Sequence, residues 1–276
     1  MSAVNIWEKM LNIDRRWIFL AIGVVSIIPF LLSIGMPITP ADEVKNIYDY
    51  VDSLDSDDAI FISFDYAPGT QAENTPMGVA VMRHAFHNNV PVFMTAYVPL
   101  GQGMAEGALN YVTNPAVPGY FQKVEFEEWA ELREAGITNK QELVEGWEAR
   151  GNQLPDDAAG WVFEGRDFAL LGYAPLFHLV ILGMSASIES QFPQDVYGNP
   201  LSEMPMLREH KNLREVDLAL STSGSSACTM WIIYGREKIG LPVAFGVTAV
   251  MATDYYPYIQ SGQIIGQMGG LRGAAE

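Results

Sequence analysis

The chain has 276 residues, of which 49% are hydrophobic and 18% are charged, and its net charge is −17 at pH 7. An apolar composition without low-complexity tracts is typical of a folded domain with a sizeable core and excludes a disordered tail. The strong negative charge repels phosphate backbones and thereby excludes nucleic-acid binding. The single cysteine, Cys228, excludes an intrachain disulfide.

The first predicted element is an uncharged apolar segment at residues 17–36, with the sequence WIFLAIGVVSIIPFLLSIGM. Twenty helical residues rise about 30 Å, which matches the hydrocarbon core of a bilayer. The segment therefore predicts a single transmembrane helix, with the lipid bilayer as its partner. The alternatives are a buried core helix and a cleaved signal peptide, although the small-residue cleavage site of a signal peptide is absent.

Basic residues predict the orientation of this segment. Lys9, Arg15 and Arg16 precede it, whereas the thirty residues after it contain only Lys45. Because cytoplasmic flanks carry an excess of Lys and Arg, we expect residues 1–16 in the cytoplasm and the main domain on the periplasmic or extracellular side. Residues 1–16 hold three basic and two acidic side chains, so the remainder of the chain carries a net charge of −18.

Residues 37–58 are predicted to form a short connector and a helix next to the membrane. Thr39 and Pro40 have the residue types of a helix N-cap and first turn. Apolar residues then recur at three- and four-residue intervals, at Val44, Ile47, Val51 and Leu54. A connector of only a few residues is expected to hold the following domain close to the bilayer.

Residues 59–276 predict an extracytoplasmic α/β domain. Its five strand-like runs are residues 59–64, 90–97, 168–172, 216–221 and 241–248. Several of these runs are almost wholly apolar instead of alternating, as is typical of parallel strands covered by helices on both faces. The predicted helices lie at residues 77–87, 104–112, 176–189, 226–239 and 256–275. This order predicts a mainly parallel, doubly wound sheet in a three-layer domain.

Residues 123–150 depart from the alternation of strands and helices. They are rich in Glu and predict a helical insertion between the second and third strands. Its inward-facing residues are expected to be Trp129, Leu132, Leu143 and Trp147. The acidic surface has two interpretations, a solvated face that keeps the protein soluble and a surface that docks a partner.

Polar residues follow the carboxyl ends of the predicted strands, where open parallel sheets bind ligands. The tentative ligand-binding residues are Asp65, Tyr97, Ser223, Gly224, Ser225, Ser226 and Asp254. Residues 221–226 form a Gly/Ser turn that leads into a predicted helix, whose free N–H groups favour an anion. The alternative is that Ser225 or Ser226 only caps that helix.

Motifs that would name a reaction are absent from the sequence. Neither G-x-x-x-x-G-K-[ST] nor G-x-G-x-x-G occurs, so nucleotide binding lacks specific support and no cofactor is predicted. The nucleophile motif G-x-S-x-G is also absent. A serine hydrolase built on Ser223 or Ser225 with Asp254 stays as the least favoured alternative. His84 and His87 are three residues apart but lack a third ligand nearby, so no metal site is predicted.

The last predicted helix, residues 256–275, carries Gly262, Gly266 and Gly270 at four-residue spacing. Glycines on one stripe of a helix let another backbone approach closely. These three residues are therefore a tentative helix-packing interface. The partner is either another element of the same domain or a second protein subunit.

The end of the chain resembles a known family in part. Residues 216–224 (VDLALSTSG) and 240–266 (GLPVAFGVTAVMATDYYPYIQSGQIIG) look like the closing βαβα portion of type I periplasmic binding proteins. The resemblance covers about fifty residues and depends on topology and on a strand, Asp, aromatic, helix order. It implies an extracytoplasmic ligand-binding module.

Three functions are compatible with these features. The favoured hypothesis is a noncatalytic accessory or interaction subunit of a membrane assembly, with other membrane-protein subunits or a second copy as partners. The second is a receptor or sensor domain for a small anion or metabolite. The serine hydrolase is the third.

Overall fold

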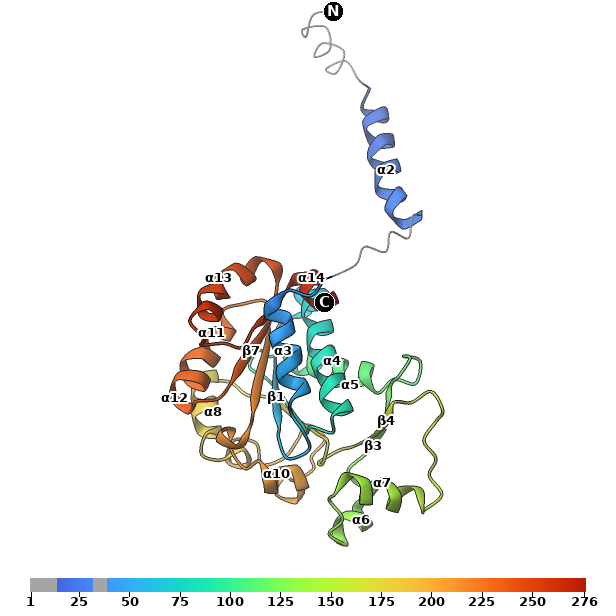
Figure 1. Ribbon diagram of the computed structural model, residues 1–276, viewed down its shortest axis with the longest axis vertical. Helices are drawn as coiled ribbons and strands as arrows, with labels where there is room; N and C mark the ends of the chain where they lie inside the picture. The colour runs from blue at the N-terminus through green and yellow to red at the C-terminus, as the bar shows by residue number, and fades with distance from the viewer. Residues whose placement is uncertain (1–13, 32–38) are drawn as a thin grey trace, which may run out of the picture. The chain divides into compact units, whose positions relative to one another are not determined.

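The computed structural model describes residues 14–31 and 39–276 (Figure 1). The chain divides into two compact units, residues 1–39 and residues 40–276. The described part of the first unit is essentially one helix, α2 (Arg15–Leu31), whereas the second unit contains all the strands that the structure describes.

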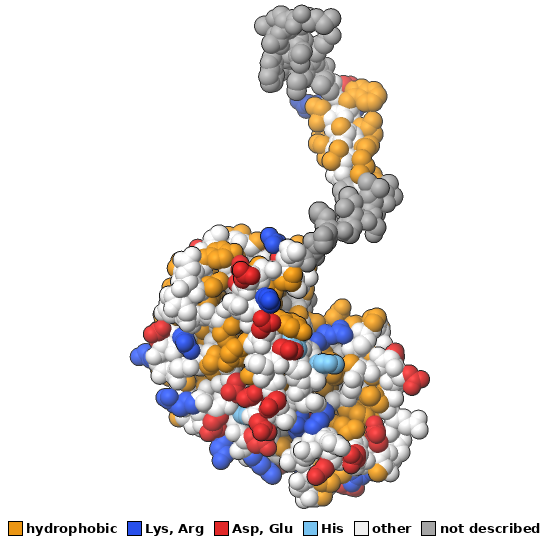
Figure 2. Space-filling view, viewed as in Figure 1, with side chains coloured by type: hydrophobic (Ala, Val, Ile, Leu, Met, Phe, Trp, Pro, Cys, Tyr) orange, Lys and Arg blue, Asp and Glu red, His pale blue; other side chains and the backbone are white. Residues whose placement is uncertain are grey.

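Helix α2 is apolar from Trp17 onward, and its side chains at residues 17–22 and 24–28 are exposed. Figure 2 shows hydrophobic side chains over its surface, with charged groups at its start. Among the described residues, no helix combines the length and the apolar character needed to span a membrane. The 17 residues of α2 rise only about 26 Å. The transmembrane helix predicted at residues 17–36 is thus unsupported, and its last residues, 32–36, lie outside the described part of the chain.

The second unit is built on a six-stranded sheet in which all neighbouring strands are parallel, in the order β5-β2-β1-β6-β7-β8. The strands are β1 (Ile60–Asp65), β2 (Val92–Ala96), β5 (Phe168–Tyr173), β6 (Leu218–Ser223), β7 (Val243–Val247) and β8 (Gln267–Gly269). This confirms the predicted mainly parallel α/β sheet. Numbered along the chain within this sheet, the order reads 3-2-1-4-5-6, which is the Rossmann-like arrangement.

Helices cover both faces of the sheet, because alternate residues of the buried strands point to opposite sides. Phe61 and Phe93 belong to one core, and Ile60 and Ile62 belong to the other. The first core packs against α8 (Phe177–Met184) and α13 (Ala249–Gln260), and the second packs against α3 (Asp42–Asp52), α4 (Gln71–His87) and α5 (Gly101–Val112). Figure 1 shows these two groups of helices on either side of the strands.

Helix α3 occupies the stretch predicted next to the connector, and it buries Ile47 and Val51 as expected. Its start differs from the prediction, because Ala41 and not Thr39 is the N-cap residue. No side chain caps this helix, whereas Asp42 and Glu43 in its first turn favour the positive end of the helix dipole.

The helices after β6 and β7 contain one confirmed prediction and one error. The predicted helix at residues 226–239 exists as α11 (Ala227–Met230), a π-helical segment η4 (Trp231–Arg236) and α12 (Glu237–Ile239). The single helix predicted at 256–275 is wrong. Helix α13 ends at Gln260, Gly262 adopts a left-handed φ of 71°, and the chain then forms β8 before α14 (Gly270–Ala275).

The predicted helical insertion at residues 123–150 contains two helices, α6 (Ala130–Glu134) and α7 (Lys140–Glu148). The observed insertion is longer than predicted, because these helices lie between two parallel strands that the sequence did not reveal, β3 (Phe121–Val124) and β4 (Gly160–Phe163). Of the expected inward residues, Trp129, Leu132 and Leu143 are buried and Trp147 is half-buried. The remaining short elements are η1 (Pro68–Thr70), α9 (Ile188–Gln191), η2 (Leu201–Glu203), α10 (Pro205–Glu209) and η3 (Leu213–Glu215).

Candidate functional site

The strand order reverses between β1 and β6, and the carboxyl ends of these two strands form the switch-point edge of the sheet. The register of the pair places Asp65 opposite Ser223 and Ser63 opposite Ser221. Two of the residues predicted as ligand-binding, Asp65 and Ser223, therefore lie side by side. The backbone of a third, Tyr97, reaches the same place from the end of β2.

Asp65 is the centre of a buried hydrogen-bond network. Its Oδ2 accepts the Ser63 hydroxyl at 2.7 Å and the Ser221 hydroxyl at 3.0 Å. Its Oδ1 accepts the backbone N–H of Tyr97 at 2.9 Å. Burial raises the pKa of Asp65 to about 6, because desolvation of the charged carboxylate outweighs these hydrogen bonds. The carboxyl group thus titrates close to neutral pH.

Three aromatic rings close over this network. The Tyr97 ring lies 4.1 Å from that of Phe177 and 6.1 Å from that of Trp231, measured between centroids. The Tyr97 hydroxyl and the Trp231 indole N–H are buried without a hydrogen-bond partner. The Trp231 N–H lies near enough to Asp65 to help lower its pKa, but it makes no hydrogen bond of normal geometry. This edge of the sheet therefore has two buried hydrogen-bond donors without an acceptor, both close to the Asp65 carboxyl group.

Trp231 owes its position to irregular backbone. It begins the π-helical segment η4, and wider turns of this kind recur at functional sites. Phe177 follows Leu176, which has a left-handed φ of 59° and an exposed side chain. Such strain persists only where the surroundings enforce it. The rings of Trp231 and Phe177 are thus both held next to the Asp65 network by segments with irregular backbone conformation.

The Gly/Ser turn after β6 is held by its own side chains. The Ser223 hydroxyl accepts the N–H of Ser225 at 3.0 Å and lies 3.2 Å from the carbonyl oxygen of Asp65, to which it donates. Gly224 packs against Thr70, because a Cβ at position 224 would lie 2.8 Å from the Thr70 Oγ1. Ser226 is the N-cap residue but makes no capping bond, whereas the Ser225 hydroxyl accepts the N–H of Ala227 at 3.4 Å.

Asp254 does not join the other predicted residues. It lies in the second turn of α13 with an exposed side chain, because β7 ends at Val247 and the helix begins at Ala249. Within residues 39–276, none of the hydrogen bonds of the Asp65 carboxylate involves Asp254. The side chains that contact the Asp65 carboxylate are instead those of Ser63 and Ser221. The sequence carried a signal for Ser63, since it precedes Asp65 by two residues and shares its face of the strand.

The three glycines near the chain end do not share a helix stripe. Gly262 lies in an exposed turn, and Gly270 has a left-handed φ of 62° at the start of α14. Gly266 precedes β8, and a Cβ there would lie 2.0 Å from the carbonyl oxygen of Glu43 in α3. Close backbone approach therefore occurs at Gly266, but it joins two elements of the same domain.

The histidines take part in other contacts. The His84 ring nitrogen lies 3.1 Å from an Asp52 oxygen, and His210 Nδ1 lies 2.8 Å from the carbonyl oxygen of Glu215. In the described residues, no histidine hydrogen-bonds to Ser223 or Ser225. No group of three metal-ligating side chains occurs there either.

The strand order and the buried carboxyl network define the class of this domain, a Rossmann-like α/β unit with a polar switch point. No family model matches the chain, and neither the curated proteins nor the solved structures give a match. The partial resemblance to type I periplasmic binding proteins thus gains no support from these comparisons.

Proposed function

We propose that this protein is a membrane-attached α/β domain that serves as a noncatalytic interaction subunit. The exposed apolar surface of α2 carries the proposal. The side chains of Trp17, Phe19 and Val25 are 67%, 70% and 67% exposed, and six further apolar side chains of α2 are exposed as well. A helix that is apolar on all sides is stable in apolar surroundings, such as a bilayer, and not in water.

The proposed attachment is a single span formed by residues 17–36, of which the structure describes residues 17–31. Arg15 and Arg16 begin α2 and favour a cytoplasmic amino terminus. The α/β domain then lies on the periplasmic or extracellular side. Its strongly negative charge is compatible with that side, since anionic lipids gather on the cytoplasmic leaflet.

A second apolar surface supports an interaction role for the α/β domain. Leu100, Leu176 and Leu179 are 59%, 65% and 53% exposed, and Tyr173 is 38% exposed. Tyr173 is the last residue of β5, and the three leucines follow the carboxyl ends of β2 and β5, which are neighbouring strands. The Tyr173 N–H donates a 3.3 Å hydrogen bond to Gln102, which follows β2. Exposed apolar side chains are typical of protein contact surfaces where they form one patch.

Vesicle flotation tests the membrane attachment. The full chain is expected to float with neutral phosphatidylcholine vesicles, and Val25→Asp is expected to weaken flotation because it places a charge in the apolar helix. Val250→Asp is the matched control, since Val250 is 83% exposed on α13. Equal flotation of both variants, or no flotation of the parent chain, would contradict the proposal.

Purification from native membranes in mild detergent tests the interaction role. We expect a complex larger than the 30.5 kDa chain, either with other membrane proteins or with a second copy. Leu176→Asp and Leu179→Asp are expected to dissociate that complex, whereas Val250→Asp leaves it intact. A strictly monomeric protein without a membrane partner would contradict this role.

A small-anion or metabolite receptor is the second candidate function. It is favoured by the two unpartnered donors, Tyr97 Oη and Trp231 Nε1, beside Asp65 at the switch point. Thermal-shift screening with inorganic anions and carboxylate metabolites is expected to reveal stabilisation that Tyr97→Phe abolishes. Lack of stabilisation by every compound would remove this candidate. The serine hydrolase gains no support from the geometry around Ser223 and Ser225.

A further inference from the structure

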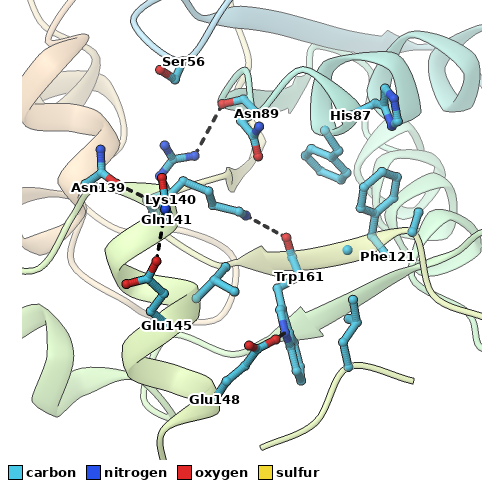
Figure 3. A pocket seen from close by; sticks show the side chains of 16 residues that line it. Ser56, His87, Asn89, Phe121, Asn139, Lys140, Gln141, Glu145, Glu148 and Trp161 are labelled. Atoms are coloured by element: carbon cyan, nitrogen blue, oxygen red, sulfur yellow. Dashed lines mark hydrogen bonds between the residues drawn. The ribbon is translucent and has the colours of Figure 1, made fainter. Parts of the chain in front are cut away.

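A cleft of about 670 Å³ lies at the opposite edge of the sheet, near the amino ends of β1, β2 and β5. One wall is the insertion, with α7, β3 and β4, and the other comes from the end of α4 and the loops before the strands (Figure 3). Its volume is typical of pockets that bind small molecules. None of the residues predicted as ligand-binding lines it.

A buried cluster of three charges lies at the base of this cleft. Asp167 is 2% exposed and accepts hydrogen bonds from Lys140 Nζ and Arg166 Nη1. Lys140 also donates to the carbonyl oxygen of Trp161 at 2.6 Å, as Figure 3 shows. Arg166 is only 8% exposed, and its Nη1 lies 3.4 Å from the carbonyl oxygen of Asn89. These contacts fix both cations in place.

With Lys140 protonated, the cluster carries one positive charge in excess, although burial lowers the pKa of Lys140. Burial alone would raise the pKa of Asp167, but the charges of Lys140 and Arg166 hold it below its ordinary value. Two cations then face one carboxylate, and removing them from water costs free energy that a single counter-ion does not fully offset. An anion in the cleft would supply the missing charge. The buried base of the cleft is thus cationic, whereas its exposed lining includes Glu145 and Glu148.

The other side of the cleft is apolar. Phe86, Phe121 and Trp161 contribute rings that are nearly buried, and Val144 and Leu154 add aliphatic surface. The Phe86 and Phe121 rings meet edge to face, with centroids 5.5 Å apart. Such a wall favours the hydrocarbon or aromatic body of a ligand over a second charged group.

Two carboxylates of α7 limit the charge of the ligand. Glu145 accepts a hydrogen bond from Gln141 at 3.0 Å, and Glu148 accepts the indole N–H of Trp161 at 3.4 Å (Figure 3). Both are exposed and line the cleft. They repel a polyanion such as a nucleoside triphosphate more strongly than they repel a single carboxylate.

We propose that this cleft binds a small organic monocarboxylate with an apolar or aromatic body. The carboxylate pairs with Arg166 Nη2, since Nη1 donates to Asp167 and Asn89 and Nε donates to the carbonyl oxygen of Thr138. The body of the ligand packs against Phe121 and Trp161. The site does not depend on the membrane attachment or on the switch point.

Calorimetric titration of the full chain in detergent with phenylacetate tests the site, with phenylacetamide as its uncharged counterpart. We expect phenylacetate to bind with a dissociation constant of about 1 mM or tighter, and the amide to bind at least tenfold more weakly. Citrate, as a polyanion of similar size, is expected not to bind. Equal binding of acid and amide would overturn the role of Arg166.

A pair of tryptophan substitutions on α7 locates the binding. Val144→Trp fills the cleft and is expected to weaken phenylacetate binding at least tenfold. Glu142→Trp is the matched control, because Glu142 is exposed on the same helix and does not line the cleft. Arg166→Gln is expected to abolish the preference for the acid over the amide in protein that remains folded. Unchanged binding by Val144→Trp, or no binding by the parent chain, would overturn the proposal.

Discussion

The two edges of the sheet bury an aspartate each, and the two environments are opposite. At the carboxyl edge, Asp65 has only hydroxyl and amide donors, and burial raises its pKa to about 6. At the amino edge, Asp167 lies between Lys140 and Arg166, which keep its pKa below the ordinary value. Burial alone therefore does not decide the charge of a carboxyl group, because the neighbouring charged groups can reverse its effect on the pKa.

The edges also differ in how they are filled. Side chains of the chain itself close the switch point, where the rings of Tyr97, Phe177 and Trp231 cover the carboxyl network. The amino edge stays hollow, because the insertion adds a second wall beyond the sheet. The switch point is therefore covered by aromatic rings, whereas the open cleft lies where an insertion meets the sheet.

The largest expected effect comes from breaking the charge cluster at the amino edge. Asp167→Asn leaves Lys140 and Arg166 buried without a counter-ion, which is expected to cost about 3–5 kcal/mol of unfolding free energy. Urea denaturation followed by circular dichroism measures this cost. The matched control is Asp65→Asn at pH 8, which removes a carboxylate that is buried without a cation and is expected to cost far less. Equal losses would show that the two sites do not differ as described.

The pH dependence of stability separates the two aspartates next. Asp65 has a folded pKa of about 6 against an ordinary value of 3.8, so its contribution is complete below pH 4 and is lost as the pH rises through 6. The loss is about 3 kcal/mol for this shift. Asp167 acts in the opposite sense, because its stabilisation is lost as the pH falls below the ordinary range of an aspartate.

Thermal and urea unfolding between pH 4 and pH 8 checks this prediction. The parent chain is expected to lose stability across the interval, and Asp65→Asn is expected to flatten that slope. Ser225→Ala is the control, because Ser225 is exposed and does not contact the carboxyl group. A slope that Asp65→Asn leaves unchanged would assign the pH dependence to other groups.

The strands could be predicted from the sequence because long apolar runs are the strongest signal that a buried parallel sheet provides. Asp65 and Ser223 could be placed at the switch point because both follow such runs. Asp254 was misplaced, since the strand before it ends at Val247 and the residues after it form a helix. Strands β3, β4 and β8 were missed, because three or four residues give too few positions for a period to show.

The cleft could not be predicted at all. Its charged residues, Lys140 and Arg166, are 26 positions apart in the sequence and meet at Asp167 in the folded chain. The position of Trp231 next to Asp65 could not be predicted either, since its local sequence does not indicate a π-helical segment. Both features depend on contacts between distant parts of the chain, which a local pattern does not encode.

A moderate effect is expected from crowding the turn at the switch point. Gly224→Ala adds a Cβ that lies 2.8 Å from Thr70 Oγ1, and overpacking of this kind costs about 1–3 kcal/mol. Thr70→Ala removes the atoms nearest to that Cβ. The double variant is therefore expected to be more stable than the sum of the single effects predicts, as a double-mutant cycle in urea measures. Strict additivity would show that this contact does not close the turn.

The smallest expected effect tests the backbone at the cleft. Asn89 has a left-handed φ of 60° at the end of α4, and its carbonyl oxygen faces Arg166. Asn89→Ala is expected to cost about 1 kcal/mol, because a Cβ without the amide disfavours this conformation. Asn89→Gly should preserve stability, since glycine adopts positive φ freely. If both variants unfold at the same urea concentration, the left-handed conformation contributes nothing, and Arg166 is held by its ion pair with Asp167.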